Sequence, residues 1–159
     1  MDNQDKEHLQ FLPISINISG KKILIVGGGR IAYHKILLLK PYTNSFTIVA
    51  PFIKDEIKKL GLKTIEREYQ KKDLNGHFLV YACTNISDLN RRVKEDANQS
   101  GMLANVVDNP VMCDFVSPAI YKNGHFTVSV GSNARDVLKA IKIRDYIKTI
   151  LDNDFSKIN

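Results

Sequence analysis

Short apolar runs alternate with amphipathic segments along the first two thirds of the chain. The run Lys22–Val26 is rich in β-branched residues and, after its lysine, has no polar interruption. Such a run is typical of a strand buried on both faces of a parallel sheet. Gly27–Gly29 ends it, and residues 30–39 then place apolar side chains at helical spacing until Pro41, which disfavours helix before it. The pattern predicts a strand, a glycine turn and a helix.

The same alternation continues to about residue 107. The expected elements are strand Phe46–Ala50, a short helix Ile53–Leu60, a weaker strand Thr64–Glu66, strand Phe78–Ala82, helix Asp88–Ser100 and strand Leu103–Val107. Strands that alternate with helices predict a parallel sheet with right-handed crossovers and helices on both faces. We therefore expect an α/β fold of the Rossmann-type, doubly wound class.

The pattern changes after Val107. Two runs rich in strand-forming residues, Pro118–Tyr121 and Phe126–Val130, flank an Asn-Gly pair, which is a turn signal. They predict a small β-hairpin outside the parallel sheet. Residues 134–152 then read as a helix with an apolar stripe along one face. The stripe either packs on its own domain or meets a second copy of the chain, and the pattern leaves both open.

Length and composition suit a single globular domain with a short appendage. The chain has 159 residues, of which 43% are hydrophobic and 25% charged. It has no run of about 20 apolar residues, the length that a membrane span needs. We divide it into a doubly wound domain, residues 1–110, and a hairpin and helix segment, residues 111–159. Because the first residues lack the basic start and apolar stretch of a secretion signal, we expect a soluble, cytoplasmic protein.

Charge and cysteine content narrow the function classes. The net charge of +6 suits either nucleic acid or a small polyanion, but the basic residues are spread without the dense cluster that nucleic-acid binding favours. Cys83 and Cys113 are expected to be free thiols. The two cysteines and four histidines show no CxxC or HxxxH spacing, so no metal site is predicted.

The glycine turn carries a motif for dinucleotide binding. Gly27, Gly29 and Ala32 fit G-x-G-x-x-A, placed between a strand and a helix. The first glycine permits the tight turn, the second lets the backbone approach a pyrophosphate, and the small third residue lets helix and strand pack closely. The start of the helix offers free N–H groups and the positive end of its dipole to the phosphates.

The usual mark of NAD specificity is missing. NAD enzymes commonly place a carboxylate at the end of the second strand to bind the ribose hydroxyls, and here that place is taken by Ala50–Phe52. Lys54 could approach a 2′-phosphate and admit NADP, whereas Asp55 or Glu56 could fold back and favour NAD. The turn itself either flanks the adenosine or is a simple corner between strand and helix.

Two later loops should border the reacting end of the cofactor, because ligands collect at the carboxyl ends of parallel strands. These loops are Ala82–Asn85 and Val107–Pro110. Asp108 lies in the second of them. A carboxylate beside a nicotinamide can act as a general base, but Asp before Asn-Pro is also a common turn-forming residue.

Further motifs follow the glycine turn in a fixed order. They are Ala50-Pro51, Asp88-Leu89-Asn90-Arg91-Arg92, Asn105-Val106-Val107-Asp108 and Cys113-Asp114-Phe115-x-x-Pro118-Ala119-Ile120. Together with Gly27–Gly29 they resemble the precorrin-2 dehydrogenase family, which includes the N-terminal domain of sirohaem synthase. The likeness runs from about Leu12 to Leu138, and Asn-Val-Val-Asp followed by Cys-Asp-Phe is far more specific than the glycine motif.

The resemblance implies an oxidoreductase that uses NAD to oxidise precorrin-2 to sirohydrochlorin in sirohaem biosynthesis. In several members it also implies insertion of ferrous iron. By position, Asp108 would be the catalytic carboxylate, taking the proton whose loss accompanies hydride removal. The residues expected to bind NAD are Gly27, Gly28, Gly29, Arg30, Ile31, Pro51, Phe52 and Thr84.

The substrate and two departures from the family pattern complete the expectations. Precorrin-2 carries many carboxylates, and Arg91, Arg92, Lys122 and Arg135 are candidates to meet them. Where the family commonly has Gly-Gly-x-Ser-Pro, this chain has Ser132–Asp136, and it ends soon after the following helix. We therefore expect a homodimeric dehydrogenase whose iron step belongs to a separate protein. The alternatives are a bifunctional dehydrogenase and ferrochelatase, a non-catalytic NAD-sensing module, and an NADP-dependent reductase, whose Ser/Tyr/Lys relay we do not find.

Overall fold

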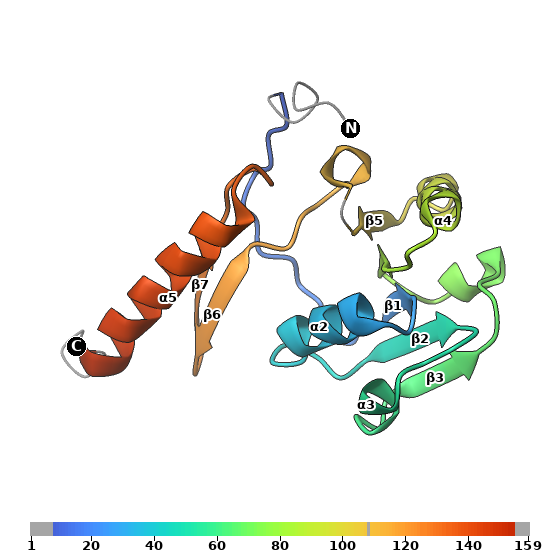
Figure 1. The fold of residues 1–159 in the computed structure, drawn as a ribbon, viewed down its shortest axis with the longest axis horizontal. Coiled ribbons are helices and arrows are strands. Elements are labelled where there is room, and N and C mark those ends of the chain that lie inside the picture. The colour runs from blue at the N-terminus through green and yellow to red at the C-terminus, as the bar shows by residue number, and fades with distance from the viewer. Residues whose placement is uncertain (1–7, 108, 155–159) are drawn as a thin grey trace. The chain divides into compact units, whose positions relative to one another are not determined.

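The structure is a computed structural model that describes residues 8–107 and 109–154. Its elements follow the expected alternation (Figure 1). In chain order they are β1 (Ile23–Val26), α2 (Arg30–Leu39), β2 (Phe46–Ala50), α3 (Asp55–Lys58), β3 (Lys63–Glu66), η1 (Lys71–Leu74), β4 (Leu79–Ala82), α4 (Ser87–Gln99), β5 (Leu103–Val106), η2 (Pro110–Met112), β6 (Ala119–Asn123), β7 (Phe126–Val130) and α5 (Val137–Asp154).

The first five strands form one parallel sheet in the order β3-β2-β1-β4-β5. In the register of the sheet, Ile25 of β1 lies beside Ile48 of β2 and Tyr81 of β4. The order reverses beside β1, which is the switch point where ligands bind in doubly wound sheets. The expected fold class is confirmed.

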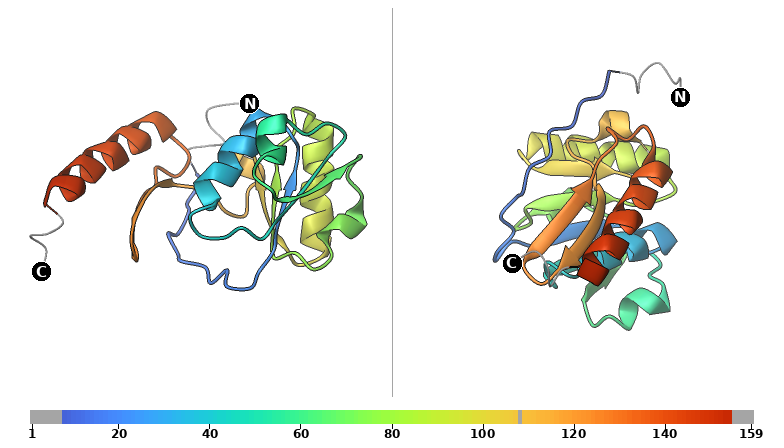
Figure 2. Two further views of the ribbon diagram at one scale, coloured as in Figure 1. Left: turned by 90° about the horizontal axis from the view of Figure 1, so that it is seen from below. Right: turned by 90° about the vertical axis from the view of Figure 1, so that its left-hand side faces the viewer.

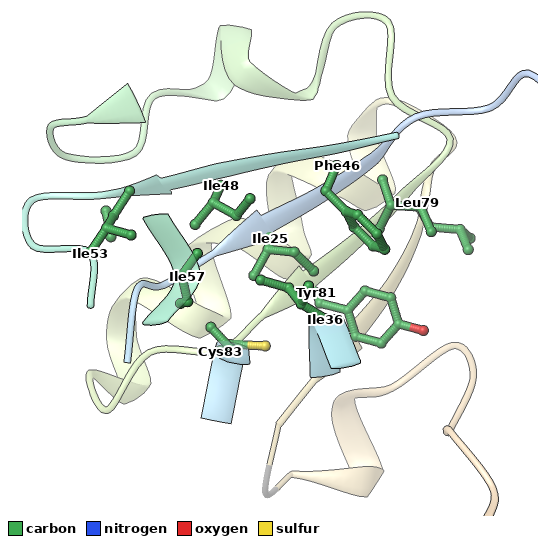
Figure 3. Packing of buried hydrophobic residues seen from close by; sticks show 12 residues of the cluster. Ile25, Ile36, Phe46, Ile48, Ile53, Ile57, Leu79, Tyr81 and Cys83 are labelled. Atoms are coloured by element: carbon green, nitrogen blue, oxygen red, sulfur yellow. The ribbon is translucent and has the colours of Figure 1, made fainter. Parts of the chain in front are cut away.

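Alternate residues of the strands fill two cores. Ile23 and Ile25 of β1 belong to the core that includes residues of α2 and α3, while Leu24 and Val26 belong to the core that includes residues of η1 and α4. Figure 2, left, shows α2 and α3 on one side of the sheet and α4 on the other. Figure 3 shows the first of these cores, in which strand side chains such as Ile25 meet Ile36 of α2. All four residues of β1 are at most 1% exposed, which explains why this strand is uniformly apolar.

Helix α3 is shorter than the expected helix Ile53–Leu60. Ile53 is buried at the turn that enters the helix, and Lys54 N donates to Gly28 O at 2.9 Å. This bond ties the entry to the glycine turn and holds it out of the helix. At the other end Gly61, with φ +68°, closes the helix.

The chain divides into two compact units. One is Ser15–Phe115, and the other joins residues up to Ile14 to the segment from Val116 onward. The sheet unit therefore runs past residue 110, where the sequence pattern put the boundary. Its last residues return along β5, where Asp114 N donates to Ala104 O at 3.0 Å and Asp114 Oδ2 accepts from Ala104 N at 2.9 Å.

The second unit contains the expected hairpin, with β6 and β7 paired antiparallel and α5 packed on it (Figure 2). Asn123 pairs with Phe126, so the turn is Gly124-His125, with the positive φ of +55° at Gly124. Helix α5 begins three residues later than the expected residue 134, because Ala134 has a left-handed φ of +61°. Asp136 Oδ1 then accepts from Lys139 N at 2.8 Å and caps the helix.

Two further expectations concern the state of the cysteines and the presence of membrane-spanning helices. Cys83 is buried, Cys113 is partly buried, and both are reduced thiols, as expected. Within residues 8–107 and 109–154, no helix combines the length and apolar character needed to cross a membrane.

Candidate dinucleotide-binding site

The three glycines after β1 have different environments. A Cβ at Gly27, whose φ is +126°, would lie 2.6 Å from Cys83 O, and a Cβ at Gly28 would lie 2.1 Å from Phe52 O. Both contacts are with backbone, so only glycine fits at these two positions. A Cβ at Gly29 would meet no heavy atom within 4 Å. The first two glycines are thus required by packing, and the third borders open space.

That open space faces the start of α2. The first helical hydrogen bond runs from Tyr33 N to Gly29 O at 3.1 Å, so the N–H groups of the first turn, including those of Arg30 and Ile31, precede it. This turn contains no acidic residue. Ala32 is fully buried, which suits the close packing expected of the third motif position. A helix start with unbonded N–H groups and no acidic residue favours an anion such as a pyrophosphate.

A cavity of about 690 Å³ opens from the glycine turn. Every residue expected from the sequence to bind NAD borders it: Gly27, Gly28, Gly29, Arg30, Ile31, Pro51, Phe52 and Thr84. The rest of its lining is Val26, Val49, Ala50, Glu68, Tyr69, Cys83, Asn85, Ile86, Leu89 and Arg92. Its size falls in the usual range for a small-molecule or cofactor site.

The sequence did not predict one group of residues that lines the cavity. Glu68 and Tyr69 follow β3, and Arg92, which we had assigned to the substrate, reaches the same cavity from α4. Tyr69 is 4% exposed and donates to Asp96 Oδ2 at 3.1 Å. Burial and the neighbouring carboxylate raise the pKa of Tyr69 well above its ordinary value, so its hydroxyl stays protonated. Applying the carboxyl-end rule to the third strand as well would have found this group.

The loop after β4 is held by Asn90 of α4, a buried residue. Its Oδ1 accepts from Thr84 N at 3.2 Å and from Thr84 Oγ1 at 2.7 Å, and its Nδ2 donates to Thr84 O at 2.9 Å. Thr84 is therefore fixed at the cavity through three contacts with one side chain. This explains the asparagine of the motif Asp88-Leu89-Asn90-Arg91-Arg92 in physical terms.

The loop after β5 is held by the thiol of Cys113. Its Sγ accepts from Val106 N at 3.2 Å, and its single S–H has two acceptors within reach, Val106 O at 3.2 Å and Asn109 O at 3.3 Å, so the sulfur lies against both sides of the loop. Burial raises the pKa of this thiol, which therefore stays protonated and able to donate. Asp108, the expected catalytic carboxylate, lies outside the described residues.

Other candidates are not among the residues that line the cavity. Lys54 pairs with Glu56 at 3.3 Å, and neither borders the cavity. Arg91 is exposed on α4 outside the lining, and Lys122 and Arg135 belong to the other unit. In the part of the chain that the structure describes, no cluster of three or more His, Cys, Asp or Glu side chains could hold a metal ion.

Comparison with known proteins identifies the family. Residues 14–119 match the model of a family described as putative NAD(P)-binding. The chain belongs to this family. Its putative NAD(P)-binding region includes every residue that borders the cavity.

The relatives carry the name expected from the motifs. The siroheme synthase of Vesicomyosocius okutanii is 35% identical over 94% of this chain, and that of Pseudomonas fluorescens is 33% identical over 94%. The chain spans 33% of the length of each. A solved structure named SirC, precorrin-2 dehydrogenase, has the same fold, with a TM-score of 0.79 and 22% identity over 92% of this chain and 74% of the other. The resemblance inferred from the motifs is confirmed.

Proposed function

We propose that this chain oxidises precorrin-2 to sirohydrochlorin with NAD as the hydride acceptor. The observation that carries the proposal is the alignment of 94% of the chain with siroheme synthases. The cavity on the glycine turn supports it, because a dehydrogenase needs a dinucleotide site at this switch point. The name of the structural neighbour, precorrin-2 dehydrogenase, agrees with the same reaction.

The residues of the cavity fit a dinucleotide. The space left open at Gly29 lies before the N–H groups of α2, where a pyrophosphate would be held. Pro51 and Phe52 would flank the adenosine, and the loop with Thr84 would border the nicotinamide end. When bound there, NAD supplies the acceptor for the hydride removed from the substrate.

The proton that balances hydride removal needs a base of the protein. We assign this role to Asp108, by its place in the Asn-Val-Val-Asp motif at the carboxyl end of β5. A carboxylate in that position takes the proton as the hydride leaves, so that two electrons and two hydrogens are removed in all.

The test is anaerobic incubation of the purified chain with precorrin-2 and NAD. We expect NADH and the sirohydrochlorin spectrum to appear together, and only when NAD is present. Ferrous iron added afterwards should be inserted no faster than in the absence of protein, which would make the chain a dehydrogenase alone. If no NAD-dependent product forms, the catalytic proposal is wrong and a nucleotide-sensing module becomes the better account.

We further propose that the active form is a homodimer joined through the unit that contains α5. Among the described residues of this unit, Ala140 is the only buried apolar one. Phe126, Leu138 and Tyr146 are instead 65%, 73% and 69% exposed. A two-stranded hairpin with one helix has marginal stability by itself. We call these three exposed side chains the apolar surface of the unit, and a second copy of the chain would cover it symmetrically.

We expect Leu138→Glu to convert the dimer to a monomer, because it puts a charge into the apolar surface. Light scattering after gel filtration at micromolar protein measures the mass. Lys148→Glu, at an exposed polar position of the same helix, is the matched control and should leave a dimer. A wild-type monomer under these conditions would rule out the homodimer.

The proposal also locates the reaction in the cytoplasm. Cys83 and Cys113 are both reduced thiols, which is the usual state of cysteine in a reducing compartment. To test the location, cells that express the full-length protein are fractionated and each fraction is assayed for NAD-dependent oxidation. We expect the activity in the cytoplasmic fraction.

A further inference from the structure

The residues at the end of β2 do not decide whether the cavity binds NAD or NADP. Ala50–Phe52 at that end bring no carboxylate to repel a 2′-phosphate. Lys54, the cation that the sequence offered for such a phosphate, is paired with Glu56 at 3.3 Å and does not border the cavity. The choice must therefore depend on charged groups contributed by other elements.

Three charged residues border the described cavity: Arg30 at the start of α2, Glu68 after β3 and Arg92 on α4. Together they carry one net positive charge. Arg30 lies at the helix start, beside the proposed pyrophosphate position, so its charge is used there. Glu68 and Tyr69 follow β3, which lies next to β2 in the sheet, and Arg92 lies against the Tyr69 ring. We therefore place the charges of Glu68 and Arg92 on the side where Pro51 and Phe52 would flank the adenosine.

The guanidinium of Arg92 is positioned by Tyr69 and Asp96, but Asp96 is shared with other groups and does not fully neutralise its charge. It lies 5.8 Å from the centre of the Tyr69 ring, and its Nε is 3.9 Å from Asp96 Oδ2. Asp96 is also engaged by the Tyr69 hydroxyl at 3.1 Å and by Lys71 at 3.7 Å. With the Arg92 side chain still 59% exposed, its Nη donors can turn to a ligand, since no described contact uses them.

We propose that Arg92 lets this cavity accept the 2′-phosphorylated dinucleotide NADP as well as NAD, and is the residue that sets the preference between them. The inference rests on the proposed function, because it takes the cavity as the dinucleotide site. An arginine can bind a phosphate through two parallel N–H bonds, and its contact with the Tyr69 ring limits the ordering cost of doing so. Glu68 opposes the same phosphate, so NAD, the acceptor of the proposed reaction, is bound as well.

Titration of the full chain with NADH and NADPH, followed by nicotinamide fluorescence, tests the proposal. The wild type should bind NADPH within about tenfold of NADH, and Arg92→Gln should weaken NADPH by about tenfold, as loss of a charge-assisted pair implies. NADH affinity should change by less than about threefold. Because the lost contact is between charges, NADPH binding should fall with added salt in the wild type and much less in the variant.

Two further variants test whether NADPH binding depends on a contact with Arg92 or on the overall positive charge of the protein. Lys59→Gln removes an exposed cation next to α3, outside the cavity, and should change neither affinity. Lys54→Gln tests the cation that the sequence suggested, and it should also have no effect. Thermal melting of each variant verifies that the proteins remain folded.

Several results would overturn the inference. It is wrong if the wild type binds NADH but excludes NADPH, if Arg92→Gln weakens both dinucleotides equally, or if Lys54→Gln is the variant that loses NADPH. If the folded wild type binds neither dinucleotide, the cavity is not a dinucleotide site and the proposed function falls with it.

Discussion

Gly27→Ala and Gly28→Ala are each expected to destabilise the fold by about 2–5 kcal/mol, from overpacking and backbone strain. The added Cβ would lie 2.6 Å from Cys83 O at Gly27 and 2.1 Å from Phe52 O at Gly28. Relief requires backbone to move, either at the end of β4 or in the turn that leads to α3. Gly27 adds a φ of +126°, which an L side chain rarely adopts. Urea unfolding of the purified variants measures the loss.

Gly29→Ala is the matched control from the same turn, and it separates folding from ligand binding. Its Cβ would touch nothing in the protein, so the free energy of unfolding should change by less than about 1 kcal/mol. The methyl group would instead occupy the approach to the helix start, and NADH affinity should fall at least about tenfold. Normal NADH binding by Gly29→Ala would mean that the pyrophosphate lies elsewhere. Wild-type stability of Gly28→Ala would contradict the packing of the turn.

The sheet was predictable because burial alone dictates its strands. A strand covered on both faces has few polar positions, so β1, β2 and β4 appear as largely apolar runs. The exception in β2 is the buried Thr47, whose hydroxyl is hydrogen-bonded to His77 at 2.9 Å. Helix α3 was overestimated for the opposite reason. Its entry is fixed by the bond from Lys54 N to Gly28 O, between residues 26 positions apart, and no local pattern reports such a contact.

The part of the cavity that contains a sequence motif could be predicted. The part that depends only on the order of the strands in the sheet could not. The glycine turn and Ala50–Phe52 were found from spacing. Strand β3 lies at the sheet edge and is half exposed, so its pattern was weak, and the residues after it were not considered. Arg92 was only one of four candidates for the substrate carboxylates, because its charge is visible in the sequence and its position beside Tyr69 is not.

The Cys-Asp-Phe motif marked the family without revealing its structural role. The structure assigns each of its residues a contact within the sheet unit. Cys113 Sγ lies within hydrogen-bonding distance of the backbone of Val106 and of Asn109. Asp114 pairs with the nearly buried Lys94, and the Phe115 ring meets Tyr81 edge-on at 5.4 Å. The segment therefore fixes both sides of the loop after β5, which a turn needed only for chain reversal would not require.

A loop fixed in this way suits a residue with a chemical task, and Asp108→Ala tests that task most directly. We expect the variant to bind NADH within about twofold of the wild type and to oxidise precorrin-2 about 10²–10⁴-fold more slowly, the usual contribution of a general base. The anaerobic assay gives the rate, NADH titration the affinity, and thermal melting the stability. Glu95→Gln, at an exposed position on α4, removes one carboxylate elsewhere and should leave the rate unchanged.

The outcomes of this experiment separate three roles for one carboxylate. A slow variant with normal NADH affinity and stability identifies a group that acts on the substrate. A variant that turns over normally would reduce Asp108 to a turn residue before Asn109 and Pro110. A variant that melts early or loses NADH would mean that the carboxylate holds the loop or the dinucleotide, and the proton would then need another acceptor. Because the contacts of Cys113 Sγ are with the backbone of Val106 and Asn109, we expect the loop to survive the substitution and the chemistry to fail.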